Sequence, residues 1–366
     1  YFGIDMQHNI SGNLGFELNS SHIKSFDTKM RGYYKDRGMS FVDDIDLSRY
    51  PAYQSWMASN VPVLKDSKSN SLSTYISLAY SYFSYFTVNV NARIDGSNKF
   101  GDQSNDKLLP VWSASANWNL TEHEWLKNDW LDFLSLKASF GYQGNMLEGQ
   151  SPVMVIKKGT LNTHYNEYTS SIERYPNPGL KWEKTTSYNL GMDFSLFQSK
   201  LQVDASVYWK HTEDAFMTKT IATMNGVRKN SYVVNGGDID NQGYSVSLTV
   251  SPINNRDFRW SLSTSFSQVF NKLNANPDGE QYELDNFLDG SVLIKGKPVG
   301  TFYSYKFLGL SPVDGGPVFD DCEDERDLLL TLNKRDFYTR VLEASGRREP
   351  TISGNLNTSI RWRNIH

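Results

Sequence analysis

The sequence predicts an all-β protein whose antiparallel strands form a segment of a transmembrane β-barrel. Three observations lead to this prediction. Apolar and polar residues alternate with a period of two, the apolar set of the clearest segments lacks charged residues, and short connections alternate with long ones. Alternation alone fits both a water-soluble sandwich and a membrane barrel, so the other two observations decide between them.

Eight segments carry the alternation, and each has one consistently apolar face. They cover residues 72–82, 86–94, 112–120, 134–140, 188–196, 203–209, 244–250 and 260–270. Their opposite face is mostly Ser, Asn, Thr and Gly, with an occasional charge such as Arg93, Lys137, Asp193 or Asp204. A soluble sandwich usually presents a Lys/Glu-rich face to water, whereas a barrel lumen tolerates small polar groups. The composition of the polar face therefore favours a barrel.

The connections support the same prediction. Short ones at residues 84–85, 198–199 and 252–257 alternate with long ones at 41–66, 96–107, 146–181, 214–238 and from 273 onward. Short periplasmic turns and long extracellular loops are typical of outer-membrane barrels. Residues 121–132 are expected to form a helical turn on the short, periplasmic side, because Glu122 and Glu124 precede Lys127.

Weaker strands at residues 8–20, 22–36 and 349–362 bring the expected number to eleven. A bacterial single-chain barrel uses an even number of strands. We therefore expect the chain, which begins at Tyr1 and ends at His366 within a strand pattern, to be an excerpt of a larger barrel.

The composition excludes several other classes of protein. A net charge of -4 gives no basic field for nucleic acid, and a mean hydropathy of -0.53 without long apolar runs excludes membrane-spanning helices. A single cysteine, Cys322, excludes a disulfide scaffold. An aromatic content of 14% excludes a disordered tail.

Several motifs occur in order along nearly the whole chain. They are RIDGSNKFG at 93–101, WSASANW at 112–118, NPGLKWEKT at 177–185, NGGDIDNQGY at 235–244 and GTFYSYKFLGL at 300–310. With these motifs the sequence resembles the SusC/RagA family of TonB-dependent outer-membrane transporters from Bacteroidetes-type bacteria. The resemblance is weakest over residues 1–70.

The resemblance implies a 22-stranded barrel in the cell outer membrane, of which residues 1–366 would supply about 11 strands. The plug, the TonB box and the terminal strands would lie outside this chain. Such transporters import large nutrients, usually glycan oligosaccharides and sometimes peptides, with energy from TonB. The implied partners are a SusD-like lipoprotein lid, TonB, an oligosaccharide or peptide ligand and outer-membrane lipid, without nucleic acid.

No enzyme chemistry is expected, and we predict no catalytic residue, cofactor or metal site. The six histidines (His8, His22, His123, His164, His211 and His366) show no metal-ligand spacing, and no catalytic or phosphate-binding motif is present. The acidic run at 320–325 lacks the spaced Asp pattern of a calcium loop. A solvated loop is the favoured interpretation of this run, with weak calcium binding left open.

Ligand contact remains as a role for aromatic residues in the long connections. Trp56, Tyr165, Tyr168, Tyr282 and Phe287 lie near amide and carboxylate side chains, a combination that suits sugars or peptides. The alternative is that these rings pack the loops or meet the lid. For the whole chain, two other functions stay open: a soluble or surface β-rich protein that binds carbohydrate or mediates adhesion, and a passive porin.

Overall fold

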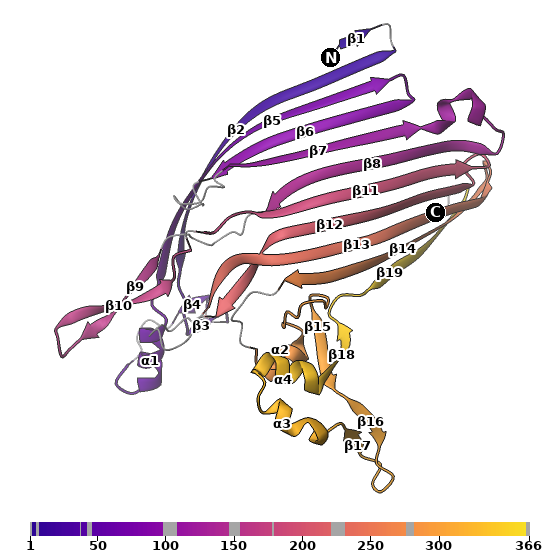
Figure 1. Cartoon of the computed structure of the whole chain (residues 1–366). Coiled ribbons are helices and arrows are strands. Elements are labelled where there is room, and N and C mark those ends of the chain that lie inside the picture. The colour runs from indigo at the N-terminus through magenta and orange to yellow at the C-terminus, as the bar shows by residue number, and fades with distance from the viewer. Residues whose placement is uncertain are drawn as a thin grey trace.

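A computed structural model describes residues 2–4, 7–36, 38–41, 46–97, 108–145, 154–177, 179–220, 231–275 and 282–363. An eleven-stranded antiparallel sheet dominates the molecule (Figure 1). The strands follow one another in chain order, so the sheet is an up-and-down meander with β1 and β19 at its edges. Residues 98–101 of the first family motif lie outside the described residues.

The strands of this sheet are long and regularly paired. They are β1 (Phe2–Ile4), β2 (His8–Asp27), β5 (Val63–Tyr82), β6 (Phe86–Ser97), β7 (Leu108–Asn119), β8 (Leu131–Asn145), β11 (Glu183–Leu196), β12 (Leu201–Thr220), β13 (Ser231–Asn254), β14 (Phe258–Ala275) and β19 (Ile352–Trp362). The ladder between β2 and β5 runs without a register shift from His8 opposite Tyr82 to Asp27 opposite Val63.

The alternation of short and long connections is confirmed. Residues 83–85, 197–200 and 255–257 form tight turns at one end of the sheet. At the same end, β7 and β8 are joined through two 3-10 turns, η1 (Leu120–Glu122) and η2 (Glu124–Leu126), where a helical turn was predicted. The longer connections gather at the opposite end (Figure 1).

The predicted number of strands was right, but not every predicted segment corresponds to one strand of the sheet. The expected strand at 8–20 and the first part of the one at 22–36 form a single strand, β2, which ends at Asp27, and the eleventh strand is the short β1. The polar run from Asn19 to His22 interrupts the alternation of side chains, yet the backbone stays paired with β5 throughout.

Several strands also extend beyond the predicted segments. The lengths of β5, β12 and β13 are 20, 20 and 24 residues. Most of the expected loop at 214–238 is therefore strand. Extensions beyond the apolar band need no alternation of apolar and polar side chains, so periodicity could not reveal them.

The two faces of the sheet differ as the sequence predicts. On β5, Leu72, Ile76 and Leu78 are 42%, 42% and 46% exposed, whereas Ser73, which points to the opposite face, is 4% exposed. We call the apolar face the outer face and the polar face the inner face. Among the described residues, no second sheet packs against the outer face. The apolar side chains are therefore not the core of a sandwich.

Other elements lie in the long connections. The link between β2 and β5 carries β3 (Tyr33–Tyr34), β4 (Ser40–Phe41) and α1 (Pro51–Ser59). The link between β8 and β11 carries a hairpin of β9 (Val155–Asn162) and β10 (Glu167–Arg174). No helix of the described part is long and apolar enough to cross a membrane.

The segment between β14 and β19, expected as a long loop from residue 273, contains a small folded unit. Its elements are α2 (Leu284–Asp289), β15 (Thr301–Tyr305), β16 (Phe307–Leu310), β17 (Pro317–Phe319), η4 (Glu323–Glu325), α3 (Arg326–Leu329), α4 (Lys334–Val341) and β18 (Leu342–Arg347). β15 pairs with β18, and Phe287, Val292 and Tyr303 lie in the buried core of the unit. In the view of Figure 1, this unit lies below the long-connection end of the sheet.

Candidate functional site

The inner face of the sheet is a wall of small polar side chains that hydrogen-bond across strands. Asn189 on β11 donates to Ser139 Oγ on β8 at 3.0 Å, and the hydroxyls of Ser206 and Ser245 lie 2.8 Å apart across β12 and β13. Backbone groups are satisfied by the ladders, so these side chains need only satisfy one another and water. The wall is consequently polar, as the lining of a water-filled lumen is.

Arg93, on β6, is the central residue of a charged cluster on this inner wall. Its Nε donates to Asp95 Oδ1 at 2.7 Å, and one Nη donates to Ser73 Oγ at 2.9 Å and to Glu17 Oε2 at 3.4 Å. The cluster thereby joins β2, β5 and β6 through one guanidinium group. Because two carboxylates surround this cation, its positive charge is compensated within the wall itself.

A hollow of about 490 Å³ opens beside this cluster. Tyr75, Arg93, Tyr142, Gln143 and Asn189 contribute to its lining. The hollow therefore offers an aromatic ring, amides, hydroxyls and one cation on a single wall. Groups of these kinds can hydrogen-bond the hydroxyls of a sugar or the backbone of an extended peptide.

A second charged cluster lies on the inner wall toward the short turns. Lys137 on β8 forms an ion pair with Asp193 on β11. Asp204 on β12 is the direct cross-strand neighbour of Asp193. Two carboxylates therefore accompany one ammonium group in this cluster.

Three of the five predicted ligand-contact residues lie at the long-connection end. Trp56, in α1, stacks on Tyr53 with ring centres 5.7 Å apart, and the Arg31 guanidinium lies 4.3 Å above the Trp56 ring. Tyr165, in the β9–β10 turn, is 72% exposed, and Tyr168, on β10, is 61% exposed. The ring of Tyr165 is available to a ligand or a partner protein, whereas the Lys158 ammonium lies over one face of the Tyr168 ring, 3.6 Å from its centre.

Tyr282 and Phe287 lie instead inside the small unit. Tyr282 is 8% exposed and Phe287 is 0% exposed. The ring of Phe287 meets those of Tyr282 and Tyr303 edge-to-face, with centres 6.3 and 5.3 Å apart. These rings pack the loop, which is the alternative that the sequence left open, and Phe287 presents no surface to a ligand.

The acidic run at 320–325 is engaged by basic side chains. Lys306 Nζ lies 2.8 Å from Asp320 Oδ2, and Arg340 forms a two-pronged ion pair with Glu325. Hydrogen bonds from these basic groups hold the pKa of Asp320 and the pKa of Glu325 below their ordinary values. Burial, followed by the nearby acidic groups, raises the pKa of the Cys322 thiol, so this cysteine is not an activated nucleophile.

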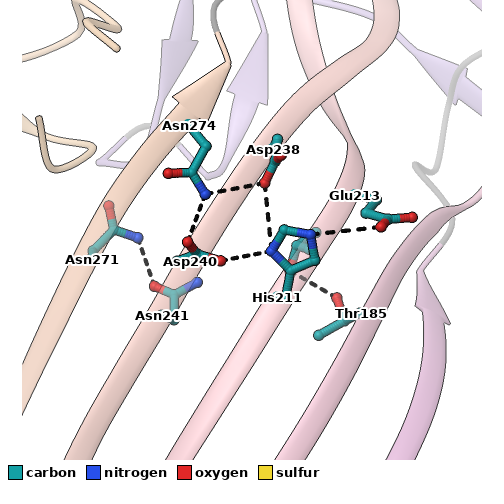
Figure 2. Close-up of polar contacts among 9 residues, drawn as sticks. Thr185, His211, Glu213, Asp238, Asp240, Asn241, Asn271 and Asn274 are labelled. Atoms are coloured by element: carbon teal, nitrogen blue, oxygen red, sulfur yellow. Dashed lines mark hydrogen bonds and ion pairs between the residues drawn. The ribbon is translucent and has the colours of Figure 1, made fainter. Parts of the chain in front are cut away.

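One polar cluster on the outer face of the sheet was not predicted from the sequence. Strand pairing places His211 of β12 opposite Asp240 of β13, with Asp238 also nearby (Figure 2). Sequence spacing gave no sign of this arrangement, because the residues lie on different strands and meet only through the register. His366, the last of the six histidines, lies outside the described residues.

A long antiparallel sheet with an apolar outer face, a hydrogen-bonded polar inner face and alternating connections defines the wall of an outer-membrane β-barrel. Residues 1–313 match the family described as "TonB dependent receptor-like, beta-barrel", and the chain belongs to this family.

Curated relatives agree with this assignment. The chain is 26% identical over 301 residues to TonB-dependent receptor P3 of Formosa agariphila, covering 78% of this chain and 30% of that protein. It is 28% identical over 225 residues to TonB-dependent receptor SusC of Bacteroides thetaiotaomicron, covering 58% of this chain and 22% of that protein. The chain thus spans less than a third of the length of these relatives. They are receptors and not enzymes, as the sequence predicts.

Solved structures show the same fold. The structure of the RagAB peptide importer in the "closed-closed" state matches with a TM-score of 0.77 at 20% identity, over 99% of this chain and 38% of that chain. The expected resemblance to SusC and RagA is confirmed by these matches.

Proposed function

We propose that this chain forms the barrel wall of a TonB-dependent importer in the cell outer membrane that takes up a large nutrient, a glycan oligosaccharide or a peptide. The observation that carries the proposal is the sheet itself, apolar and uncovered outside, polar and hollowed inside. Such a wall separates hydrocarbon from an aqueous lumen. The relatives named SusC and RagAB support the class of cargo.

The open edges of the sheet support a larger barrel. Among the described strands, β1 and β19 each have a neighbour on one side only. In hydrocarbon an unpaired backbone group costs several kcal/mol, so a spanning sheet has to close on itself. We propose that residues 1–366 supply eleven strands of a 22-stranded barrel, with the plug, the TonB box and the terminal strands supplied by other segments.

The long-connection end is the side from which cargo would enter. The rings of Tyr165 and Tyr168 are exposed there, and the ring of Trp56 stacks on that of Tyr53. In this proposal these aromatic residues contact the cargo or a SusD-like lipoprotein lid, and the hollow beside Arg93 receives the cargo further along the wall.

Uptake by intact cells tests the proposed function. Cells that carry the protein are given two labelled pools, one of neutral oligosaccharides and one of peptides, in the presence and absence of TonB. We expect one pool to be taken up only when TonB is present. Uptake that persists without TonB would indicate a passive porin, and recovery of the protein in the soluble fraction without detergent would indicate a soluble binding or adhesive protein.

A pair of substitutions connects the uptake to the loop aromatics. Replacing Tyr165 and Tyr168 together by Ala is expected to lower uptake at subsaturating cargo and to leave the amount of folded protein unchanged, because both rings are exposed. The control replaces by Ala the residue Tyr50, which is 59% exposed and lies in the connection between β2 and β5. Equal uptake by the double variant and the control would remove the two β9–β10 tyrosines from the proposed contact surface.

A further inference from the structure

The outer face changes character between two neighbouring rows of residues on β11, β12, β13 and β14. The lower row is Tyr188, Trp209, Gln242 and Phe270, and the next row toward the long connections is Thr186, His211, Asp240 and Lys272. Aromatic rings such as those of the lower row are typical of the membrane–water interface. The row of His211 and Asp240 therefore lies just outside the hydrocarbon, where water and ions have access.

Three potential metal ligands meet at this upper row: His211 and Asp240, which belong to it, and Asp238, two residues before Asp240 on β13. His211 Nδ1 lies 2.6 Å from Asp240 Oδ1 and 3.5 Å from Asp238 Oδ1. The ligand atoms of the three residues all lie within 4.8 Å of one another (Figure 2). Within the described residues, this is the set of three such side chains whose ligand atoms converge.

The backbone is irregular on both sides of Asp238. The ladder between β12 and β13 shifts register between Thr212 and Ala215, and the ladder between β13 and β14 shifts between Asp238 and Ile239. Bulges re-aim side chains that a regular strand would separate. Asp238 and Asp240, two residues apart on β13, both bring a carboxylate to the same imidazole nitrogen.

Neighbouring side chains hold this set in place. The Asn274 amide, on β14, donates to Asp240 Oδ2 at 2.6 Å and to Asp238 Oδ1 at 3.3 Å (Figure 2). On the other side, Glu213 Oε1 lies 3.6 Å from His211 Nε2. Outer partners of this kind orient the ligands of protein metal sites. Without a bound ion, Nδ1–H donates to Asp240 Oδ1 at 2.6 Å, and a bound metal ion would take the place of that proton.

We propose that His211, Asp238 and Asp240 bind a divalent transition-metal ion of the Zn²⁺ type at the outer edge of the apolar band. One imidazole nitrogen and two carboxylate oxygens are a ligand set that zinc accepts, and water can take the remaining position. Calcium prefers six to eight oxygen ligands, so the imidazole disfavours it. Three carboxylates, counting Glu213, surround this imidazole, whereas one ammonium group, that of Lys272, is the cross-strand neighbour of Asp240. A divalent cation would compensate the remaining negative charge. The bound ion would tie β12 to β13 beyond the membrane, independently of the cargo.

Equilibrium dialysis against Zn²⁺ tests the site. The protein, purified in detergent from the outer membrane and stripped with a chelator, is compared with the variant His211→Asn. We expect the wild type to bind one more equivalent of Zn²⁺ than the variant. Equal binding by the two proteins would overturn the proposal.

A matched control is available on β2 and β5. His22 Nε2 lies 2.5 Å from Asp66 Oδ1. Another charged group near that carboxylate is the Lys24 ammonium, at 3.7 Å, and not a second carboxylate that could bind a metal ion. The variant His22→Asn should therefore keep the full Zn²⁺ stoichiometry. Loss of the same equivalent in this control would mean that exposed histidines bind zinc without a built site, and the proposal would fail.

Two further measurements separate the site from a general acidic patch. Asn274→Ala should keep the stoichiometry and weaken Zn²⁺ binding by about 10- to 100-fold, the usual cost of losing an outer partner. Calcium at the same concentration should not displace the bound zinc, and displacement would contradict the assignment. Heat-modifiable gel mobility shows whether each variant is folded. If His211→Asn fails this check, the comparison is made with Asp240→Asn.

Discussion

The ring of Tyr75 on β5 lies directly over the backbone of Gly15 on β2. A Cβ atom added to Gly15 would lie 2.1 Å from Cζ of Tyr75. The absence of a side chain at Gly15 therefore sets the position of a ring that lines the inner hollow.

Replacing Gly15 by Ala is expected to push the Tyr75 ring into the hollow. Overpacking of this kind typically costs about 1–3 kcal/mol, less where the ring can swing away. Thermal unfolding measures the stability loss, and tyrosine fluorescence reports the ring displacement. The control is Gly191→Ala on β11, where the new Cβ would meet its nearest neighbour at 3.6 Å. If both variants behaved alike, the close approach of Tyr75 would have no energetic consequence.

Replacing Leu248 by Lys should destabilise the protein far more than replacing Ser247 by Lys. Leu248 belongs to the apolar outer set of β13, and Ser247 points to the inner wall. A lysine at the bilayer midplane of a barrel costs roughly 2–4 kcal/mol, whereas the lumen accepts it. Urea unfolding in lipid vesicles measures both variants. The reverse ranking would show that the two faces had been assigned the wrong way round.

The small unit at 282–351 is expected to loosen in acid. Arg340 holds the pKa of Glu325 below its ordinary value of 4.5, and Lys306 does the same for Asp320 below 3.8. Because these folded-state pKa values are depressed, the ion pairs stabilise the unit above the ordinary values. Their contribution is lost as the pH falls through the folded-state values.

Limited proteolysis across this pH range measures the loosening, and the effect should be small because both pairs are exposed. Glu325→Gln should remove part of the pH dependence. A variant with an unchanged pH profile would show that this pair does not contribute.

Replacing Phe287 by Ala should destabilise the small unit strongly. Its ring is fully buried among Tyr282, Val292 and Tyr303, and a Phe→Ala change in a core typically costs about 3–5 kcal/mol. Hydrogen exchange over residues 282–351 measures the loss. The comparison variant Leu330→Ala, at a residue 77% exposed, should change little. Equal exchange in the two variants would mean that the small unit is not organised around Phe287.

The sequence was sufficient to predict the sheet but only part of its edge and its loops. Leu72, Ile76 and Leu78 revealed their strand because lipid requires every second residue to be apolar. The polar stretch of β2 near Ser20 carries no such requirement, so one strand was taken for two. The small unit was expected as a loop because its short elements show no sustained period.

The candidate sites were harder to predict for a different reason. His211 and Asp240 are neighbours only because β12 and β13 pair in one particular register. Gly15 and Tyr75 meet across β2 and β5 in the same way. Register is fixed by long-range pairing, so single-strand patterns do not contain these contacts. Tyr282 and Phe287 resembled exposed loop aromatics for as long as the fold of their unit was unknown.

Spin labels on β5 test the central claim most directly. Labels are placed one at a time at Ile76, Ser77, Leu78 and Ala79, with Cys322 replaced by Ser, and the protein is inserted in lipid vesicles. We expect oxygen to relax the labels at 76 and 78 and a water-soluble nickel complex to relax those at 77 and 79. Nickel access to all four positions, or protection of 76 and 78 from both reagents, would contradict a wall between lipid and a water-filled lumen.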